Sequence, residues 1–416
     1  MSSPAVGESV GESVAGTALT ATRCPVEHFA FAVRGRPPMS GFREIGELGR
    51  RWPVFRSPEA QGYWVFTRHD AIQDVFADPG LFSSHAIFAP EPDPPYRFIP
   101  TMLDPPEHTA WRRLLAPLFA PGAIKEIAPH VERRCAELVA DVAGRGECDF
   151  VADFALRFPG SVFLEVMGLP QERLDEFLSW MEAILHTPAE QDPDGMRRMT
   201  GIGQVYQVFA ERIAALRADP AVRGVDVLSR AVTWEIDGAP IPDDQLMSFC
   251  LLMFMAGLDT VAAQLSYMVL HLATHPDDRR RLVADPDLGP VAVEEMMRAF
   301  PIVQPARKVT RDVEFRGCSL KAGDMVMVSL PFSGRDAGRY PDPDRVDFDR
   351  EHLPNLSFGG GVHRCLGSAL ARRELTAALR EWHAAVPDYE VVPGAELSEY
   401  MGPTFGLDAL PLRWSV

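Results

Sequence analysis

Closely spaced pairs of cysteines are missing from this sequence of 416 residues. Its six cysteines show no C-x-x-C motif and no regular spacing: Cys24, Cys135, Cys148, Cys250, Cys318 and Cys365. Such a pattern indicates neither a zinc site nor a framework of disulfides. We therefore expect free thiols and a reducing, cytoplasmic setting.

Basic residues and targeting signals are also scarce. Lys and Arg number 41 against 58 Asp and Glu, a formal net charge of −17, so nucleic acid is a poor candidate for a partner. Residues 1–30 are small, polar and acidic, without the basic start and apolar core of a signal peptide or the roughly 20 apolar residues of a membrane span. We expect residues 1–30 to be a flexible tail and residues 31–416 to form one soluble domain. It should be a monomer without a membrane partner.

A nucleotide-binding fingerprint is likewise absent, since no G-x-G-x-x-G follows a predicted strand. A redox enzyme built on this chain must therefore receive its electrons from another protein.

Helical periodicity dominates the middle of the chain. Between Pro106 and Pro286 apolar residues recur at i, i+3, i+4 and i+7, and Ile241–Pro276 is apolar on nearly all sides, as expected of a buried helix. β-branched and aromatic residues with glycine turns predict strands at Tyr63–Thr67 and after Phe300. We predict a mainly helical fold with a smaller β region.

One cysteine stands in a glycine-rich motif at the start of a predicted helix. The motif F-G-x-G-x-H-x-C-x-G is formed by Phe358, Gly359, Gly361, His363, Cys365 and Gly367. Glycines let the backbone approach a flat ligand, and the free amides of a helix start stabilise a thiolate. A lone cysteine is more often a buried structural residue. Six residues at fixed spacing nevertheless favour a thiolate ligand of haem iron.

This motif resembles that of the cytochrome P450 haem-thiolate monooxygenases. The resemblance runs from about Tyr63 to the C-terminus and is nearest to soluble bacterial members, including the camphor-hydroxylating type. It implies a triangular prism in which haem b lies between the long central helix and the cysteine-loop helix, with Cys365 on the iron and O2 as co-substrate. The camphor type has an aspartate where this chain has Pro305, two residues before a propionate-binding arginine, so substrate identity does not transfer.

The sequence AGLDT, Ala256 to Thr260, interrupts the long apolar helix. By resemblance, Thr260 would hydrogen-bond dioxygen, Asp259 would relay protons, and Ala256 and Gly257 would leave space for dioxygen. The alternative is a helix kink in which the Thr260 hydroxyl returns to the carbonyl four residues earlier.

Further haem contacts follow from the resemblance. His108 and Arg112 are four residues apart, on one face of the helix expected along the haem edge, and Arg307 and His363 occupy two more propionate positions. The predicted cofactor-binding residues are His108, Arg112, Ala256, Gly257, Arg307, Phe358, His363 and Gly367.

A second pair of charges is assigned a structural role. Glu295 and Arg298 are neighbours on one helix face and match the E-x-x-R ion pair of the family. By resemblance, Arg345 in the irregular segment downstream would complete that ion pair.

The predicted substrate pocket is mostly apolar, which indicates a compact hydrophobic substrate. Its residues are Ile87, Tyr96, Phe98, Thr101, Leu252, Met255, Ile302, Val303 and Thr404. Tyr96 could orient the substrate through its phenol, or be a loop tyrosine anchored to backbone. Residues 87–100 and 186–200 are candidate gates.

These features predict a monooxygenase that inserts one oxygen atom of O2 into a terpenoid or secondary-metabolite-like molecule. Electrons would pass from NAD(P)H through a ferredoxin reductase and a ferredoxin. The acidic ferredoxin would dock on a basic cluster, the alternative being a solvated helix face. That cluster is Arg112, Arg113, Arg364, Arg372 and Arg373. The rival hypotheses are a peroxide-using haem-thiolate enzyme and a non-enzymatic haem sensor.

Overall fold

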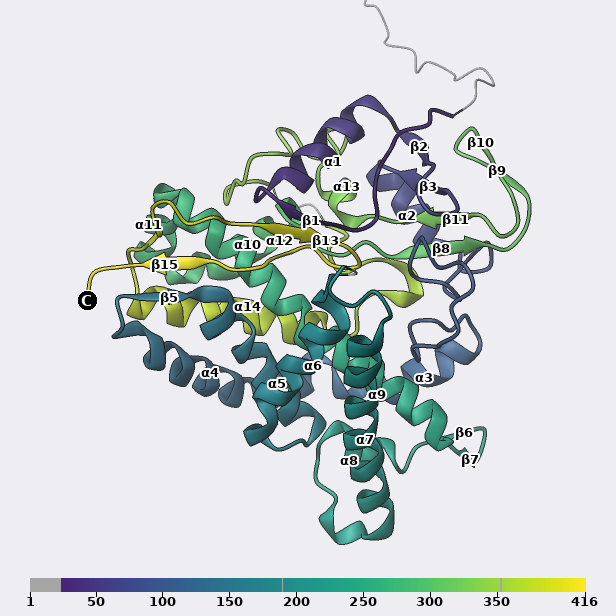
Figure 1. The fold of residues 1–416 in the computed structure, drawn as a ribbon, viewed down its shortest axis with the longest axis horizontal. Coiled ribbons are helices and arrows are strands. Elements are labelled where there is room, and N and C mark those ends of the chain that lie inside the picture. The colour runs from purple at the N-terminus through teal and green to yellow at the C-terminus, as the bar shows by residue number, and fades with distance from the viewer. Residues whose placement is uncertain (1–23, 189, 352–353) are drawn as a thin grey trace, which may run out of the picture.

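The computed structural model describes residues 24–188, 190–351 and 354–416, and helices make up most of it (Figure 1). The helices are α1 (Ser40–Arg51), α2 (His69–Ala77), α3 (Glu107–Leu115), α4 (Pro121–Ala143), α5 (Arg157–Met167), α6 (Leu174–Met181), α7 (Met196–Ala218), α8 (Val227–Ala231), α9 (Asp243–Leu258), α10 (Thr260–Thr274), α11 (Pro276–Ala284), α12 (Gly289–Ala299), α13 (Leu330–Gly334) and α14 (Ser368–Ala385). The prediction of a mainly helical fold with a smaller β region is confirmed.

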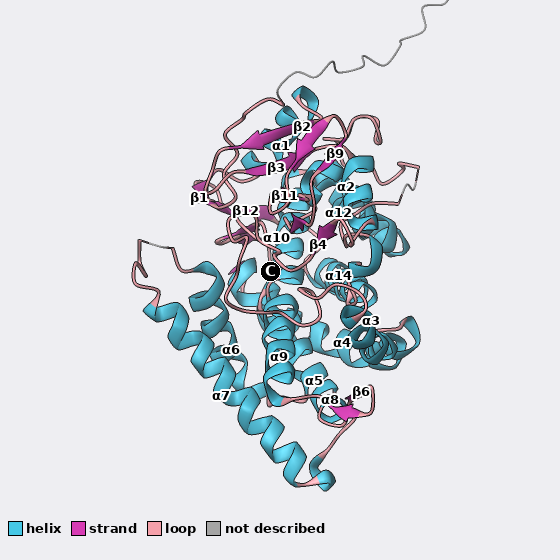
Figure 2. Cartoon of the chain, turned by 90° about the vertical axis from the view of Figure 1, so that its right-hand side faces the viewer, coloured by secondary structure: helices cyan, strands magenta, loops and turns pink. Residues whose placement is uncertain are grey.

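The largest sheet has five strands in the order β2-β3-β11-β8-β4, of which only β3 and β11 pair in parallel. These strands are β2 (Val54–Ser57), β3 (Tyr63–Phe66), β4 (Phe82–Ser83), β8 (Ala306–Val309) and β11 (Met325–Met327). They gather at one end of the molecule, and α5 to α9 lie at the other (Figure 2). The strands predicted near Tyr63 and after Phe300 thus pair within one sheet, although about 260 residues separate β3 from β11.

The other strands form four small sheets at the periphery. They are β1 (Val33–Arg36) with β13 (Glu399–Met401) and β14 (Gly406–Leu407); β9 (Val313–Phe315) with β10 (Cys318–Leu320); β5 (Glu147–Asp149) with β12 (Glu390–Val391) and β15 (Pro411–Arg413); and β6 (Glu235–Ile236) with β7 (Ala239–Pro240). The C-terminal segment therefore supplies strands to two different sheets, β14 to one and β15 to the other.

The long apolar segment forms the central helix, which breaks at Asp259 into α9 and α10. By length and composition, 243–274 could cross a membrane. Within the fold, however, all side chains from Val261 to Leu272 are buried against other elements. These contacts explain the apolar composition as that of a core helix.

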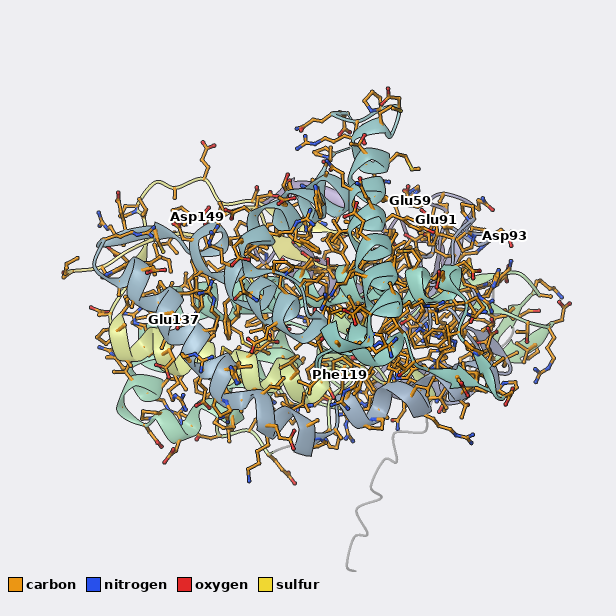
Figure 3. The ribbon with its side chains drawn as sticks, turned by 90° about the horizontal axis from the view of Figure 1, so that it is seen from below. Glu59, Glu91, Asp93, Phe119, Glu137 and Asp149 are labelled. Carbon is orange, nitrogen blue, oxygen red and sulfur yellow. A yellow bond between two sulfur atoms is a disulfide. The ribbon has the colours of Figure 1, made fainter. Side chains whose placement is uncertain are left out.

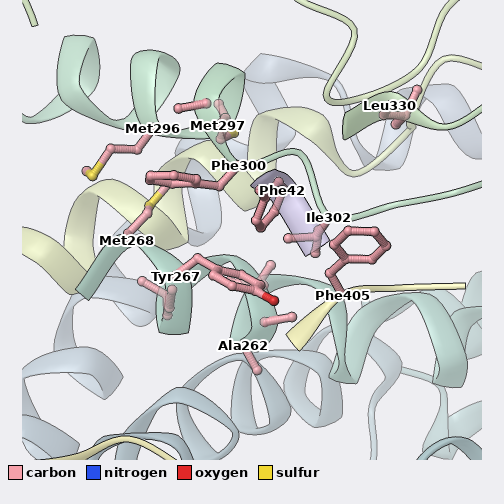
Figure 4. Close-up of a cluster of buried hydrophobic side chains, with 14 of the residues drawn as sticks. Phe42, Ala262, Tyr267, Met268, Met296, Met297, Phe300, Ile302, Leu330 and Phe405 are labelled. Atoms are coloured by element: carbon pink, nitrogen blue, oxygen red, sulfur yellow. The ribbon is translucent and has the colours of Figure 1, made fainter. Parts of the chain in front are cut away.

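Two hydrophobic cores lie on either side of this break. Around α10, the rings of Phe42, Tyr267, Phe300 and Phe405 come from four separate segments, with ring centroids 5.1 to 5.7 Å from that of Phe42 (Figure 4). The second core joins α9 to α5, α6 and α7. Both halves of the central helix are thus fixed by packing, and its break is held between them.

The Glu295–Arg298 ion pair is buried as predicted, but the prediction for its third member is wrong. Arg298 donates to Glu295 from Nε and Nη2 at 2.9 and 2.8 Å, and Arg350 donates from Nε at 3.0 Å. Arg345 offers only its carbonyl oxygen to Arg298, and its side chain is 70% exposed. Arginines at both positions fit the sequence pattern, and only the path of this irregular segment selects Arg350.

The cysteine prediction is also wrong for two residues, because Cys24 and Cys318 form a disulfide. They are 294 positions apart, so no sequence spacing could reveal the pairing. Cys24 begins a stretch that packs on the β end: Val26 pairs with Arg56 and Phe29 is buried. The folded domain therefore begins before the predicted boundary at residue 31, while residues 1–23 of the predicted tail lie outside the described residues.

Candidate active site

The cysteine loop turns tightly between Phe358 and the start of α14. The backbone amide of Cys365 donates to the Phe358 carbonyl at 2.9 Å. Gly361 has φ +60°, and a Cβ there would lie 2.0 Å from the carbonyl oxygen of Phe76 at the end of α2. Only glycine fits at this position, which lets α2 and the cysteine loop pack closely.

Cys365 differs from the other free cysteines in its surroundings. Cys135, Cys148 and Cys250 are buried, whereas the Cys365 side chain is accessible. Burial still raises the pKa of the Cys365 thiol, opposed by the amide of Gly367 and by nearby arginine charges. A thiol that is exposed among nearby arginine charges can be reached by a bound group.

Two stacked histidines lie near Arg112 and Arg307, in the same part of the fold as the cysteine loop. The rings of His108 and His363 stack with centroids 4.0 Å apart, and Nε2 of His363 bonds to the Leu103 carbonyl at 2.8 Å. Burial and the charges of Arg112 and Arg307 lower the pKa of His108 to about 4. The pKa of His363 falls to about 3, through burial, Arg307 and His108. Both rings are therefore neutral near pH 7.

Two hydrogen-bond donors of this cluster have few acceptors to bond to. Arg307 is 5% exposed and donates to the carbonyl of its neighbour Ala306, and burial lowers its pKa to about 10. Nδ1 of His108 is buried without a hydrogen-bond partner among the described residues. The nearby carboxylate of Asp104 is already bonded by Ser83 and Ser84. An exposed thiol beside such donors fits a haem, whose two carboxylates would meet the arginine charges and the free nitrogen of His108.

The break in the central helix positions Thr260 and Asp259. The Thr260 hydroxyl donates to the Ala256 carbonyl at 2.9 Å, as in the helix-kink alternative. Ala256 is exposed and Thr260 is half-buried, so this face of the helix borders an accessible space. Gly257 serves packing as well, since a Cβ there would lie 2.7 Å from the ring of Phe163 on α5. Its place beside dioxygen stays a prediction.

Asp259 is the centre of a buried hydrogen-bond network. Its carboxylate accepts from Nε2 of His186 at 2.8 Å, the Thr404 hydroxyl at 2.6 Å and the Tyr400 hydroxyl at 3.5 Å. Burial alone raises the pKa of Asp259, but the His186 charge and these bonds reverse the effect and leave the pKa below 3.8. Sequence reasoning missed His186 and Tyr400, because no pattern links either to the central helix.

Two predicted pocket residues are engaged by polar partners. Thr404, expected to contact substrate, donates to Asp259. Tyr96 donates its phenol proton to Glu91, which Figure 3 labels near Asp93. Burial and this bond raise the pKa of Tyr96. The loop tyrosine is thus anchored, to a carboxylate rather than to backbone.

The remaining pocket residues lie on several segments. Leu252 and Met255 are half-buried and, at helical spacing, share the face of α9 that carries Ala256. The rings of Tyr96 and Phe98 lie 4.8 Å apart, and Thr101 is half-buried in the same loop. Ile87 and Ile302 are buried, and Val303 pairs with Thr404. Their contact with substrate stays a prediction.

The predicted basic cluster is only partly free. Arg113 and Arg364 are exposed, and Arg112 donates to the Arg364 carbonyl at 2.9 Å. Arg372 and Arg373, however, pair with glutamates 294 and 132. Ion pairing reduces the positive field of these two arginines, so the predicted cluster of five is too large.

Comparison with known proteins places these features in context. The family model described as Cytochrome P450 matches residues 53–287 and 290–382. A probable cytochrome P450 127A1 of Sinorhizobium fredii is 34% identical, over 87% of this chain and 87% of that protein. The mycinamicin IV hydroxylase/epoxidase of Micromonospora griseorubida is 32% identical, over 89% of this chain and 90% of that protein. The crystal structure of CYP101J2 superposes with a TM-score of 0.84 at 31% identity, covering 94% of this chain and 97% of that one.

Proposed function

This chain belongs to the cytochrome P450 family, and on that premise we propose that it oxidises a compact hydrophobic molecule with electrons from a ferredoxin. It is a monooxygenase of small molecules that uses haem iron and O2. The observation that carries the proposal is the exposed thiol of Cys365 beside the charges of Arg112, Arg364 and Arg372. We place the enzyme in the cytoplasm of a bacterium, as its relatives are bacterial.

When bound, the haem activates dioxygen and transfers one oxygen atom to the substrate. Cys365 would hold the iron, and the amide of Gly367 that donates to its sulfur would tune the electron density there. Arg112, Arg307 and the unpartnered Nδ1 of His108 would hold the carboxylates. His363 would fix the ring of His108 by stacking on it.

Thr260 and Asp259 would supply protons. The Thr260 hydroxyl can leave the Ala256 carbonyl for a ligand in the accessible space beside it. Asp259 is adjacent in the chain and sits at the break, where the helical hydrogen bonds are interrupted. A positioned carboxylate and alcohol of this kind can relay a proton by accepting it and passing it on.

The substrate would be a terpenoid or another secondary-metabolite-like molecule. The apolar side chains of Leu252 and Met255 beside Ala256 support this, because they give contact area without fixed polar partners. Relatives named for mycinamicin IV and vitamin D(3) oxidation support the size and hydrophobicity, but do not identify the compound.

The first experiment tests the thiolate ligand and the electron source together. The purified, haem-loaded protein, reduced under carbon monoxide, is expected to give the red-shifted Soret band of a thiolate complex, and Cys365→Ser to lose it. Product should form with ferredoxin, ferredoxin reductase and NAD(P)H. Product with peroxide alone would favour the peroxide-using enzyme, and no turnover with any electron source would favour the sensor.

A second experiment narrows the range of possible substrates. A panel of terpenoids, polyketides and aromatics is screened for compounds that cause the blue shift of the Soret band.

The docking proposal rests on Arg113 and Arg364, which are exposed and form no ion pair among the residues that the structure describes. Arg113→Glu is expected to weaken electron transfer from the ferredoxin, most strongly at low salt. Arg311→Glu makes the same charge change on an exposed turn after β8 and serves as control. Equal effects of both substitutions would remove the proposed docking surface.

A further inference from the structure

His186, the buried partner of Asp259, has no role in the family motifs found here. His186 ends the helical turn Glu182–His186 that follows α6, and its side chain is 8% exposed against 3% for that of Asp259. Its Nε2 lies 2.8 Å from Oδ1 of Asp259. Its Nδ1 is buried and has no partner among the residues that the structure describes. Among these residues, Nε2 is therefore the ring nitrogen of His186 that forms a hydrogen bond, and its partner is Asp259.

The charged groups around this pair leave Asp259 as the dominant partner of His186. Glu182, on the same turn, is the other anion near the ring, and Arg34 of β1 is the nearby cation. The guanidinium of Arg34 lies 5.1 Å from the centre of the Tyr400 ring and pairs with Asp408 at 3.4 Å, so its charge is partly compensated.

Burial by itself lowers the pKa of His186. The charge of Asp259 and the hydrogen bond to it outweigh burial and raise the pKa above its ordinary 6.5. On the other side of Asp259, Thr404 and Tyr400 only donate neutral hydrogen bonds. Of the four groups in the network, His186 alone can neutralise the carboxylate.

We propose that His186 is a positioning residue for Asp259. As a cation bonded through Nε2, His186 keeps the Asp259 carboxylate ionised and fixes the orientation of that carboxylate relative to Thr260. This role rests on the proposed function, in which Asp259 and Thr260 supply protons. The arrangement makes proton supply depend on the charge at position 186. Replacement of the imidazolium by a neutral group leaves a buried carboxylate uncompensated, and its pKa rises.

Three substitutions separate charge from hydrogen bonding. His186→Gln keeps a donor and loses the charge, and His186→Arg keeps a permanent charge. His271→Gln is the matched control, because His271 also bonds an aspartate, Asp278, at 2.8 Å and its side chain is 7% exposed, but it lies at the far end of α10.

The activity readout is the product formed per NAD(P)H consumed, followed against pH. We expect His186→Gln to lower it by at least about 10-fold, because a positioned proton donor contributes about 10²-fold or more to rate. In the wild type this ratio should fall as pH rises through the raised pKa of His186, and His186→Arg should remove that fall. His271→Gln should change neither. A His186→Gln enzyme with the wild-type ratio and pH profile would overturn the proposal.

A second readout does not depend on turnover. In the haem-loaded protein, the histidine NMR signal that is lost in His186→Gln should titrate above pH 6.5, and Asp259→Asn should move that titration below 6.5, because burial then acts alone. A signal unaffected by Asp259→Asn would overturn the pairing. Loss of the thiolate Soret band would instead refute the proposed function and leave the pairing intact, so the two failures are distinguishable.

Discussion

At the scale of single residues, surroundings decide chemistry. Thr260 and Thr274 both return their hydroxyls to the carbonyl four residues earlier, at 2.9 and 2.8 Å. Thr274 does so at the end of α10, where the helix stops. Thr260 does so beside the accessible Ala256, at the break in the helix. The same hydrogen bond is structural at one position and available to a ligand at the other.

Thr260→Ala is expected to lower product formation per NAD(P)H by about 10- to 100-fold, since proton transfer by positioned groups contributes about 10²-fold or more. Haem content and the thiolate spectrum should stay unchanged. Thr274→Ala removes the same kind of hydrogen bond and is expected to keep full coupling. The measurement is the amount of product formed and of peroxide released per NAD(P)H consumed. A similar loss in both variants would mean that Thr260 acts only on the helix.

Glu374 illustrates a buried acid without a compensating charge. It is 4% exposed on α14, and burial raises its pKa to about 8. The folded state therefore holds a proton on Glu374 that the unfolded chain releases above its ordinary pKa of 4.5. Because the folded state binds more protons, this residue makes stability fall as pH rises from about 4.5 to about 8.

Glu374→Gln should remove that dependence. We expect the variant to gain stability over the wild type as pH rises from 5 to 8, as followed by chemical unfolding at several pH values. Glu137→Gln on the exposed face of α4, labelled in Figure 3, is the control and should leave the profile unchanged. A wild-type profile in the Glu374→Gln variant would show that the acid is ionised in the fold.

At the scale of elements, irregular segments are held by side chains that regular elements supply. Glu295 of α12 accepts two hydrogen bonds from Arg298, one from Arg350 and one from the amide of Asp347. Arg298 in turn donates to the carbonyls of Gly334, Pro343 and Arg345. The helix thereby fixes the proline-rich chain that leads to the cysteine loop.

Arg350→Ala is expected to lower the free energy of unfolding by about 2 kcal/mol, because it removes a hydrogen bond to a buried charge. Arg345→Ala should change it by less than about 0.5 kcal/mol, since that side chain is mostly exposed. Denaturant unfolding of the two variants measures the difference. The reverse order would restore Arg345 as the third member of the ion pair.

At the scale of the whole molecule, contacts distant in sequence join the β end to the helices. Glu399 of β13 accepts hydrogen bonds from the amides of Met39 and Gly41 at 2.8 and 2.6 Å, and so caps the start of α1. The Tyr267 hydroxyl of α10 donates to the same carboxylate at 3.2 Å. One buried acid thus ties the first helix, the central helix and the C-terminal strands together.

The Cys24–Cys318 disulfide is the covalent contact of this kind. In the oxidised protein it should add about 2 kcal/mol or more of stability, because it closes a long loop of the unfolded chain. A reducing cytoplasm would open it. Dithiothreitol is therefore expected to lower the thermal midpoint of the oxidised wild type and not that of Cys24→Ser.

Thiol labelling provides an independent check of the disulfide. The denatured, oxidised chain should expose the four free cysteines, and all six after reduction. Six reactive thiols before reduction would contradict the disulfide.

Sequence patterns predicted the parts of this protein that local chemistry specifies. The helical period marked the central helix, the glycine and cysteine spacing marked the haem loop, and the family resemblance followed from Cys365 and the AGLDT stretch. Contacts between distant groups could be identified only from the folded chain. It brought His186 and Thr404 to Asp259, chose Arg350 over Arg345, and joined Cys24 to Cys318. The physical reason is that a local pattern reports backbone conformation and burial, whereas pairing of side chains dozens to hundreds of residues apart depends on how the packed elements cross.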